Sequence, residues 1–271
     1  MSALSADGSA DGLPHPTLVV LLRHGETEAN SKGVLQGQSE SPLTALGRSQ
    51  AAALGSALGA RVASSGFQQP LSRTVYSSDL SRASDTAQAV IDALSGEGAS
   101  RSFELRRDAR LRERRLGPFQ GLSVGECHRR HALLWNTFNS GEDDQMVACV
   151  NQPGASENGG VELRQDMTER AVAVMRDIAA AHPGESVLVV SHGGFIHHAV
   201  CAMSDLPEDE VPHIGNCTVT TLVAPAAAGS AAPWRVQSVG EHAAHGTKNG
   251  TGSQSRTNVD LVGRGNIKAA R

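Results

Sequence analysis

Two histidines in this sequence each end an apolar run and are followed directly by glycine. His24 comes after Arg23 and an apolar run over residues 18–22, and His192 comes after a second run over residues 187–191. A neutral imidazole can attack phosphorus when its other ring nitrogen is held by a backbone carbonyl. We therefore expect His24 to act as a nucleophile toward a bound anion.

Two arginines occupy comparable positions. Arg23 directly precedes His24, and Arg82 opens a helical stretch after the apolar segment 74–77. Guanidinium groups match the oxygens of phosphate, and helix N-termini add further donors. With His192, these groups could stabilise a metaphosphate-like transition state in place of a metal ion. Phosphate is the expected ligand, and no metal or cofactor is expected.

Glu113 is the candidate proton donor. A leaving oxygen needs a proton, and the like charge of a neighbouring phosphate favours the protonated carboxyl group. The alternative is a solvated basic segment, because Glu113 lies among Arg106, Arg107, Arg110, Arg112, Arg114 and Arg115. If this segment is extended, Arg112 and Arg114 point away from Glu113, which keeps the acid role open.

An alternation of strands and helices must position these side chains. Strands are expected at 18–22, 74–77, 186–191, 217–223 and 234–239, and helices begin near Thr44, at Ser81 and at Glu162. The first helix is expected to place Leu46, Ala53, Leu54 and Leu58 on one face, with Thr44 as its N-cap. The pattern predicts an α/β fold with a mostly parallel sheet, whose last two strands pair antiparallel at one edge. Ligands of such sheets bind at the carboxyl ends of the strands.

Three regions are expected along the chain. Residues 1–16 and 246–271 are predicted to be disordered because they are rich in small and polar residues. Residues 17–245 form the expected domain, in which 120–160 reads as a lid-like insertion, partly helical over 123–138 and then loose and acidic. The basic tail could touch an acidic surface, although a solubilising role is favoured.

Composition narrows the functional classes. The 271 residues carry a net charge of −4, which argues against nucleic-acid binding and favours a small phosphorylated metabolite as partner. The four cysteines form no CxxC pair, and the start lacks a signal peptide pattern. Without an apolar run of about 18 residues, no membrane association is expected. The expected compartment is the cytoplasm, and a homodimer is left open.

Other histidines carry less weight. Of the adjacent pair His197 and His198, one is expected to pack and the other to meet solvent. His242 and His245 form an HxxH pattern near the tail, which is more often an accident of a loop than a zinc site.

Together these motifs resemble the histidine phosphatase superfamily, also called the phosphoglycerate-mutase-like family. The resemblance covers about residues 18–242 and rests on Arg23-His24-Gly25-Glu26-Thr27, Tyr76-Ser77-Ser78-Asp79-Leu80-Ser81-Arg82-Ala83, Leu111-Arg112-Glu113 and Ser191-His192-Gly193-Gly194. It implies a three-layer α/β/α sandwich. It also implies His24 as the phosphorylated nucleophile, Glu113 as the proton donor, and Arg23, Arg82 and His192 as the phosphate pocket. Substrate contacts are implied for Asn30, Gln36, Gly37 and Gly193.

The resemblance favours one branch of that family. Mutases usually have asparagine after the second His-Gly and a long basic insertion, whereas this chain has Gly194 and a shorter acidic insertion. A metal-independent phosphatase of small phosphomonoesters, such as phosphoserine or a sugar phosphate, is therefore expected. A phosphoglycerate mutase is the enzymatic alternative. A non-catalytic phosphoprotein binder is less favoured because all five pocket residues are retained.

One loop departs from the family pattern. The chain reads Gly159-Gly160-Val161-Glu162 where phosphatase-like relatives commonly have Gly-Gly-Glu-Ser or Gly-Gly-Glu-Thr. No substrate contact is assigned to this loop.

Overall fold

The computed structural model describes residues 15–243 apart from 65, 68, 97–101, 150–155, 227–229 and 231. The predicted disordered tail over 246–271 lies outside the described residues. So does the predicted disordered segment over 1–16, except for its last two residues.

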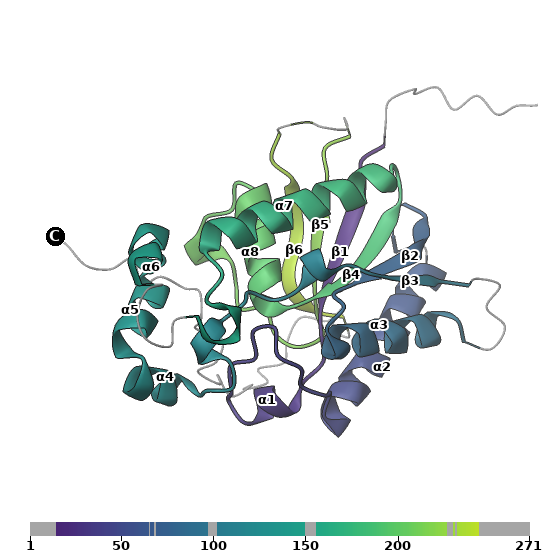
Figure 1. The fold of residues 1–271 in the computed structure, drawn as a ribbon. Helices are drawn as coiled ribbons and strands as arrows, with labels where there is room; N and C mark the ends of the chain where they lie inside the picture. The colour runs from purple at the N-terminus through teal and green to yellow at the C-terminus, as the bar shows by residue number, and fades with distance from the viewer. Residues whose placement is uncertain are drawn as a thin grey trace, which may run out of the picture.

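A six-stranded sheet forms the centre of the described part of the chain (Figure 1). Its spatial order is β3-β2-β4-β1-β5-β6. The strands are β1 (Leu18–Arg23), β2 (Leu71–Ser77), β3 (Glu104–Arg107), β4 (Ser186–Ser191), β5 (Thr218–Val223) and β6 (Arg235–His242). The pairs among β1, β2, β3 and β4 are parallel, and β5 runs antiparallel to both β1 and β6. The predicted mostly parallel sheet with an antiparallel edge is confirmed.

The edge strand β3 escaped the sequence analysis. Its four residues, Glu-Leu-Arg-Arg, are mostly exposed, so the segment has neither a continuous apolar run nor a clear alternation. Parallel pairing of Thr74 to Glu104 through Ser77 to Arg107 gives it a strand conformation. Tertiary pairing, and not local propensity, therefore forms this strand.

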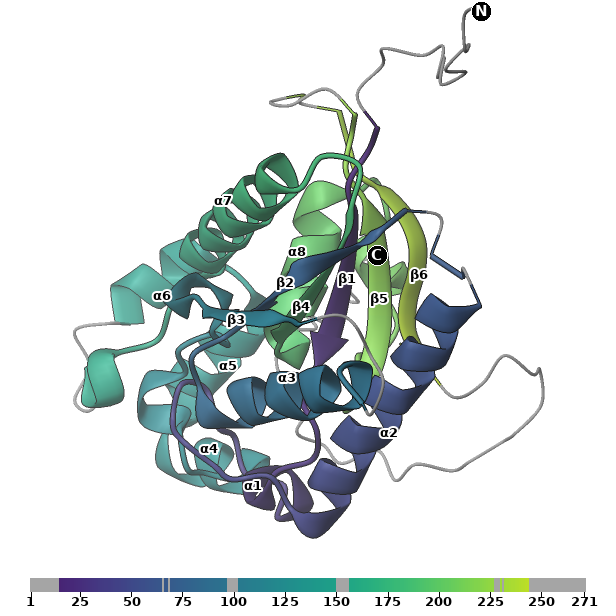
Figure 2. The same ribbon diagram turned by 90° about the vertical axis from the view of Figure 1, so that its right-hand side faces the viewer.

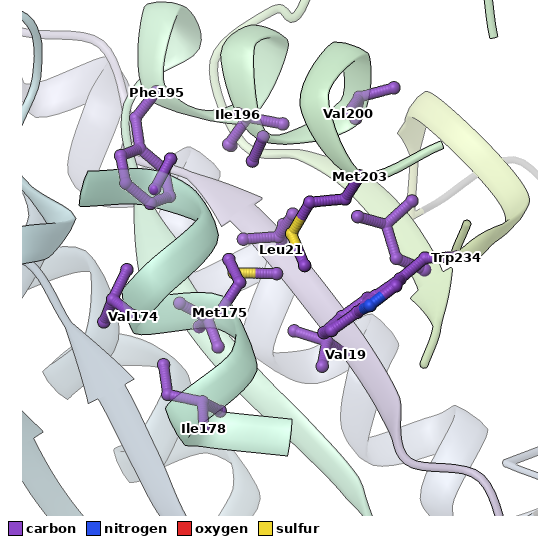
Figure 3. Close-up of a cluster of buried hydrophobic side chains, with 14 of the residues drawn as sticks. Val19, Leu21, Val174, Met175, Ile178, Phe195, Ile196, Val200, Met203 and Trp234 are labelled. Atoms are coloured by element: carbon purple, nitrogen blue, oxygen red, sulfur yellow. The ribbon is translucent and has the colours of Figure 1, made fainter. Parts of the chain in front are cut away.

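Helices cover both faces of the sheet (Figure 2). The longer ones are α2 (Ala45–Ala63), α3 (Ser81–Leu94), α7 (Arg164–Ala181) and α8 (Gly193–Met203). Side chains alternate along β1, so Val19 and Leu21 pack with α7 and α8, as Figure 3 shows, whereas Val20 and Leu22 pack with α2 and α3. The three-layer α/β/α sandwich is confirmed.

The buried face of α2 differs from the prediction. The Thr44 side chain caps the helix as expected, accepting a hydrogen bond from the Gly47 N–H. However, Leu46 and Ala53 are exposed, and the buried face contains Gly47, Ala51, Leu54, Gly55 and Leu58. A Cβ at Gly55 would come within 2.9 Å of the Val90 Cα in α3, so glycine allows the two helices to approach closely. The helix therefore turns Gly55 toward α3, and Leu46 is left exposed.

The insertion forms a separate group of short helices beside the sheet (Figure 1). These are α4 (Val124–Arg130), α5 (Ala132–Ser140) and α6 (Asp143–Cys149). The stretch 123–138, expected to be partly helical, forms α4 and the greater part of α5, with a break at His131. The acidic stretch that was expected to be loose begins α6. Phe119, Trp135 and Phe138 form an aromatic centre for this group, which we call the cap.

Single turns complete the described secondary structure: α1 (Glu28–Ser31) and the 3-10 helices η1 (Ala109–Leu111), η2 (Gly117–Phe119), η3 (Glu157–Gly159) and η4 (Glu208–Glu210). Within the ranges described above, no helix is both long and apolar enough to cross a bilayer.

Candidate active site

The carboxyl ends of the central parallel strands bring the predicted side chains together. Arg23 pairs with Ser191 in the register of β1 and β4, so His24 and His192 follow side by side. Their ring centroids are 5.2 Å apart in an edge-on arrangement. Because β2 also ends at this edge, the helix that follows it delivers Arg82 to the same place.

His24 is buried and held in one orientation. Its Nδ1 lies 2.7 Å from the carbonyl oxygen of Gly25, which can only accept, so Nδ1 carries the proton. Burial, with the charges of Arg82 and Arg23, lowers the pKa of His24 well below its ordinary value. The side chain is therefore a neutral imidazole whose Nε2 has a lone pair, as nucleophilic attack requires.

Arg82 fixes His192 in the tautomer opposite to that of His24. The Arg82 Nε–H donates to Nδ1 of His192 at 3.2 Å, so the proton of the neutral ring lies on Nε2. That Nε2 is buried and has no hydrogen-bond partner among the residues that the structure describes. Burial, followed by the Arg82 charge, lowers the pKa of His192 well below its ordinary value. A buried, unsatisfied N–H donor is suited to an anionic ligand.

Arg82 is fixed by backbone carbonyls on both sides of its guanidinium. Its Nη1 donates to the carbonyl of Ser39 at 2.8 Å, and its Nη2 donates to that of Gly37 at 2.7 Å. Burial lowers the pKa of Arg82 to about 10, so the group remains cationic at neutral pH. Arg23 is also buried and donates from Nη1 to the Ile214 carbonyl at 2.5 Å.

Glu113 is oriented by two backbone donors. Its Oε1 accepts from the Arg114 N–H at 2.9 Å, and its Oε2 accepts from the Gly194 N–H at 3.0 Å. A Cβ at Gly194 would collide with Glu113 Oε1, so a glycine at this position makes room for the carboxyl group. The first turn of α8 thus positions the candidate proton donor.

The predicted substrate contacts lie in the same place. Asn30 Oδ1 accepts from the Thr27 N–H, and Gln36 Oε1 lies 3.0 Å from the Thr27 hydroxyl. Because the amide oxygens are engaged, their NH₂ groups are the ends that could contact an anion. Gly37 has a φ of 52°, and a Cβ there would meet the Gln120 side chain, which explains the glycine.

One cavity of about 110 Å³ joins most of these groups. Of the predicted site residues, His24, Arg23, Arg82, Glu113, Asn30, Gln36, Gly37 and Gly193 line it. His192 is not a lining residue, but its ring lies directly behind this lining, against His24 and Arg82. The cavity walls also include Arg114, His197 and His198, so neither histidine of that pair simply meets solvent.

Several supporting residues were missed by the sequence analysis. Thr86 accepts from the Gly25 N–H at 3.0 Å and donates to the Arg82 carbonyl at 2.7 Å, which ties the loop after His24 to α3. Asn216 donates to the His24 carbonyl at 3.0 Å. Two signals were available: Thr86 lies one helical turn after Arg82, and Asn216 precedes the antiparallel strand that begins where β1 ends.

Glu162, from the loop that departs from the family pattern, has a structural position. It is buried and accepts from Arg170 at 2.9 Å and 3.0 Å, and Arg170 in turn donates to the carbonyls of Arg110 and Arg112. This clamp holds the segment that carries Glu113, and Glu162 does not line the cavity.

The described residues contain no group of His, Cys, Asp and Glu side chains that could hold a metal ion. His245, the second histidine of the HxxH pattern, lies outside them.

Known proteins are similar to this chain in sequence and in fold. The chain is 35% identical over 182 residues to the metal-independent phosphoserine phosphatase of Arabidopsis thaliana, an alignment that covers 66% of each protein. It is also 35% identical over 178 residues to phosphoglycerate mutase-like protein 4 of the same plant, covering 66% of this chain and 67% of that protein. A solved structure of a mycobacterial glucosyl-3-phosphoglycerate phosphatase superposes with a TM-score of 0.64 at 28% identity, covering 84% of this chain and 100% of that one.

A family model described as the histidine phosphatase superfamily (branch 1) matches residues 19–236. That range contains every element that positions the cavity, from β1 to the start of β6. The chain belongs to the histidine phosphatase superfamily.

Proposed function

We propose that this protein is a metal-independent phosphatase that hydrolyses small phosphomonoesters through a phosphohistidine at His24. The observation that carries the proposal is the hydrogen bond from His24 Nδ1 to the Gly25 carbonyl, which leaves a nucleophilic Nε2 between buried arginines. The similarity to a metal-independent phosphoserine phosphatase supports the same conclusion.

The first step transfers the phosphoryl group to the protein. His24 Nε2 attacks phosphorus, the bond to the ester oxygen breaks, and Glu113 gives its proton to the leaving alcohol. Arg23, Arg82 and the Nε2–H of His192 stabilise the equatorial oxygens, whose charge is highest in the transition state. Asn30, Gln36, Gly37 and Gly193 complete the proposed contacts with substrate.

The second step returns the site to its starting state. Water enters where the alcohol left, and the Glu113 carboxylate takes its proton as the water oxygen attacks phosphorus. The bond between His24 and phosphorus breaks, and inorganic phosphate leaves. The two backbone N–H groups that hold Glu113 keep its carboxyl group in place for both proton transfers.

The test measures phosphate release from 4-nitrophenyl phosphate in excess chelator. We expect turnover by the wild-type protein and none by His24→Ala. An acid-labile phosphoryl group should be trapped on His24 of the wild-type protein by a rapid quench at alkaline pH. Turnover that survives His24→Ala contradicts the proposed nucleophile, and tight phosphate binding without turnover indicates a binder.

A phosphoglycerate mutase is the second candidate, because a relative of equal identity is named mutase-like. Conversion of 3-phosphoglycerate to 2-phosphoglycerate, measured with and without a bisphosphate primer, separates the two activities. Rapid interconversion without net release of phosphate favours the mutase.

The remaining sequence-based expectations are part of this proposal. The small substrate binds in the cavity, the insertion over 120–160 acts as its lid, and residues 17–245 fold as one domain in the cytoplasm. Limited proteolysis with and without vanadate tests the lid, because ligand closure should slow cleavage between α5 and α6. Light scattering of the purified protein tests the homodimer.

A further inference from the structure

Arg114 is a buried cation on the wall of the cavity. Its side chain lies in the core of the cap, with its guanidinium carbon 4.4 Å from the centre of the Phe138 ring. Arg114 and Glu113 both line the cavity in which a leaving group would be protonated. The proposed mechanism uses Glu113 at this position and leaves Arg114 without a role.

The hydrogen bonds of Arg114 are incomplete. Its Nε donates to the Glu162 carbonyl at 2.8 Å, whereas its Nη1 is buried and has no hydrogen-bond partner within the described ranges. Nor does any carboxylate described by the structure lie within ion-pair distance of it. Burial lowers the pKa of Arg114 to about 10, which still leaves it charged at neutral pH. The charges of Asp143, Glu162 and Glu113 and the face of the Phe138 ring offset the burial of this cation only partly, and no ion pair completes it.

The surroundings of Arg114 favour a negative ligand. His198 also lines the cavity, and burial, with the charges of Arg114 and Arg164, lowers its pKa to about 3. It is therefore a neutral imidazole that can donate a hydrogen bond. Both oxygens of the Glu113 carboxyl group accept backbone N–H groups, so Glu113 forms no ion pair with the guanidinium of Arg114.

We propose that Arg114 and His198 form a subsite for a carboxylate on the leaving group of the substrate. One guanidinium and one neutral imidazole match a single negative charge. The phosphate dianion would instead bind among two arginines and two histidines, namely Arg23, Arg82, His24 and His192. The inference rests on the proposed phosphatase function and narrows its substrates to phosphomonoesters of small carboxylic acids. The volume of about 110 Å³ suits a small molecule.

Matched substrate pairs test this subsite. Phosphoserine has a carboxylate that phosphoethanolamine lacks, and the two are otherwise the same. In the second pair, 3-phosphoglycerate has a carboxylate where glycerol 3-phosphate has a hydroxymethyl group. We expect the wild-type protein to favour the acid of at least one pair by about 10- to 100-fold in kcat/KM, the effect of a charge-assisted hydrogen bond. Arg114→Gln should reduce this ratio toward 1, mainly through KM, and Arg114→Lys should give an intermediate ratio.

Arg115→Gln is the matched control. Arg115 belongs to the same segment and donates from Nε to the Gly160 carbonyl at 3.1 Å, but it does not line the cavity. This variant disturbs the loop without removing the subsite, so the ratio should stay at the wild-type value. Dissociation constants measured in a His24→Ala background should show the same preference and the same loss with Arg114→Gln, independently of turnover.

The outcomes separate the two proposals. Absence of turnover of 4-nitrophenyl phosphate by the wild-type protein contradicts the phosphatase function, and the dissociation constants then decide on the subsite alone. Turnover without a preference for the acid in either pair overturns the subsite only. An equal loss for acid and neutral partner in Arg114→Gln also overturns it, because that result indicates a structural role in the cap.

Discussion

Arg82 and Arg114 both line the cavity, and their surroundings, which we call the phosphate end and the selective end, differ. Each is buried, and burial lowers the pKa of each to about 10. Arg82 donates to an imidazole nitrogen and to two backbone carbonyls, which lie at 2.7 Å and 2.8 Å. Arg114 has one hydrogen bond to a carbonyl and a stacking contact with Phe138. An arginine side chain thus has three hydrogen-bond acceptors at the phosphate end and one at the selective end.

The difference follows from the elements that provide the partners. The phosphate end lies where parallel strands and helix N-termini converge, so backbone groups are present in a fixed arrangement before any ligand binds. At the selective end, Arg114 instead lies against the Phe138 ring of the cap and donates from Nε to one carbonyl, that of Glu162. A preorganised end suits the common step of phosphoryl transfer, and an incompletely paired end suits recognition of one particular leaving group.

Arg82→Lys should cause the largest loss of activity and of stability. Lysine cannot donate at once to His192 and to the carbonyls of Ser39 and Gly37, so these groups lose their partner and the phosphoryl oxygens lose a planar donor. We expect kcat toward 4-nitrophenyl phosphate to fall about 10²- to 10³-fold and the free energy of unfolding to fall by about 2–4 kcal/mol. Steady-state kinetics and urea unfolding measure the two quantities.

Arg114→Gln, measured in the same two assays, is the counterpart at the other end. Because Arg114 holds a single carbonyl, its loss should lower kcat toward 4-nitrophenyl phosphate far less than Arg82→Lys. Similar losses for the two variants contradict the distinction between a preorganised end and a selective end.

The grouping of side chains at the phosphate end was predictable from sequence because it depends on strand ends. His24 and His192 each follow an apolar run and one polar residue, and each precedes a glycine. Neighbouring parallel strands have their carboxyl ends at the same edge of the sheet, so the two histidines must lie close together. Thr86 was not predicted because a threonine inside a helix has many roles, and only the fold shows that it faces Gly25. The role proposed for Arg114 was also beyond the sequence, which indicated only that it points away from Glu113.

The cap was the least predictable region. Its apolar residues follow a helical period over 123–138, yet the chain turns at His131, where φ is −137° and ψ is 42°. The break lets Trp135 and Phe138 stack on each other against Phe119, and this packing is not encoded in local periodicity. Likewise, Leu46 is exposed because glycines, and not large apolar residues, make the closest contacts of α2.

Thr86→Val should give the intermediate effect. Valine has nearly the shape of threonine but leaves the buried Gly25 N–H and the Arg82 carbonyl without their hydroxyl partner. We expect kcat to fall about 10-fold, because the loop after His24 would shift and move His24 Nε2 away from the position needed to attack phosphorus. The free energy of unfolding should fall by about 2 kcal/mol. Thr86→Ser, which keeps the hydroxyl group, is the control and should retain most of kcat; an equal loss in both variants points to lost packing instead.

The smallest effect is expected at the selective end, in the pH dependence of stability. With its pKa lowered to about 3, His198 stays neutral in the folded protein while the unfolded chain takes up a proton below pH 6.5, so His198 disfavours folding as the pH falls. Between pH 7.5 and 5.5 this contribution is about 1.4 kcal/mol. His198→Gln should therefore lose less stability than the wild-type protein over that interval in urea unfolding. The buried histidines of the phosphate end are present in both proteins, so the difference isolates His198. Equal losses contradict a buried, neutral imidazole at the proposed carboxylate subsite.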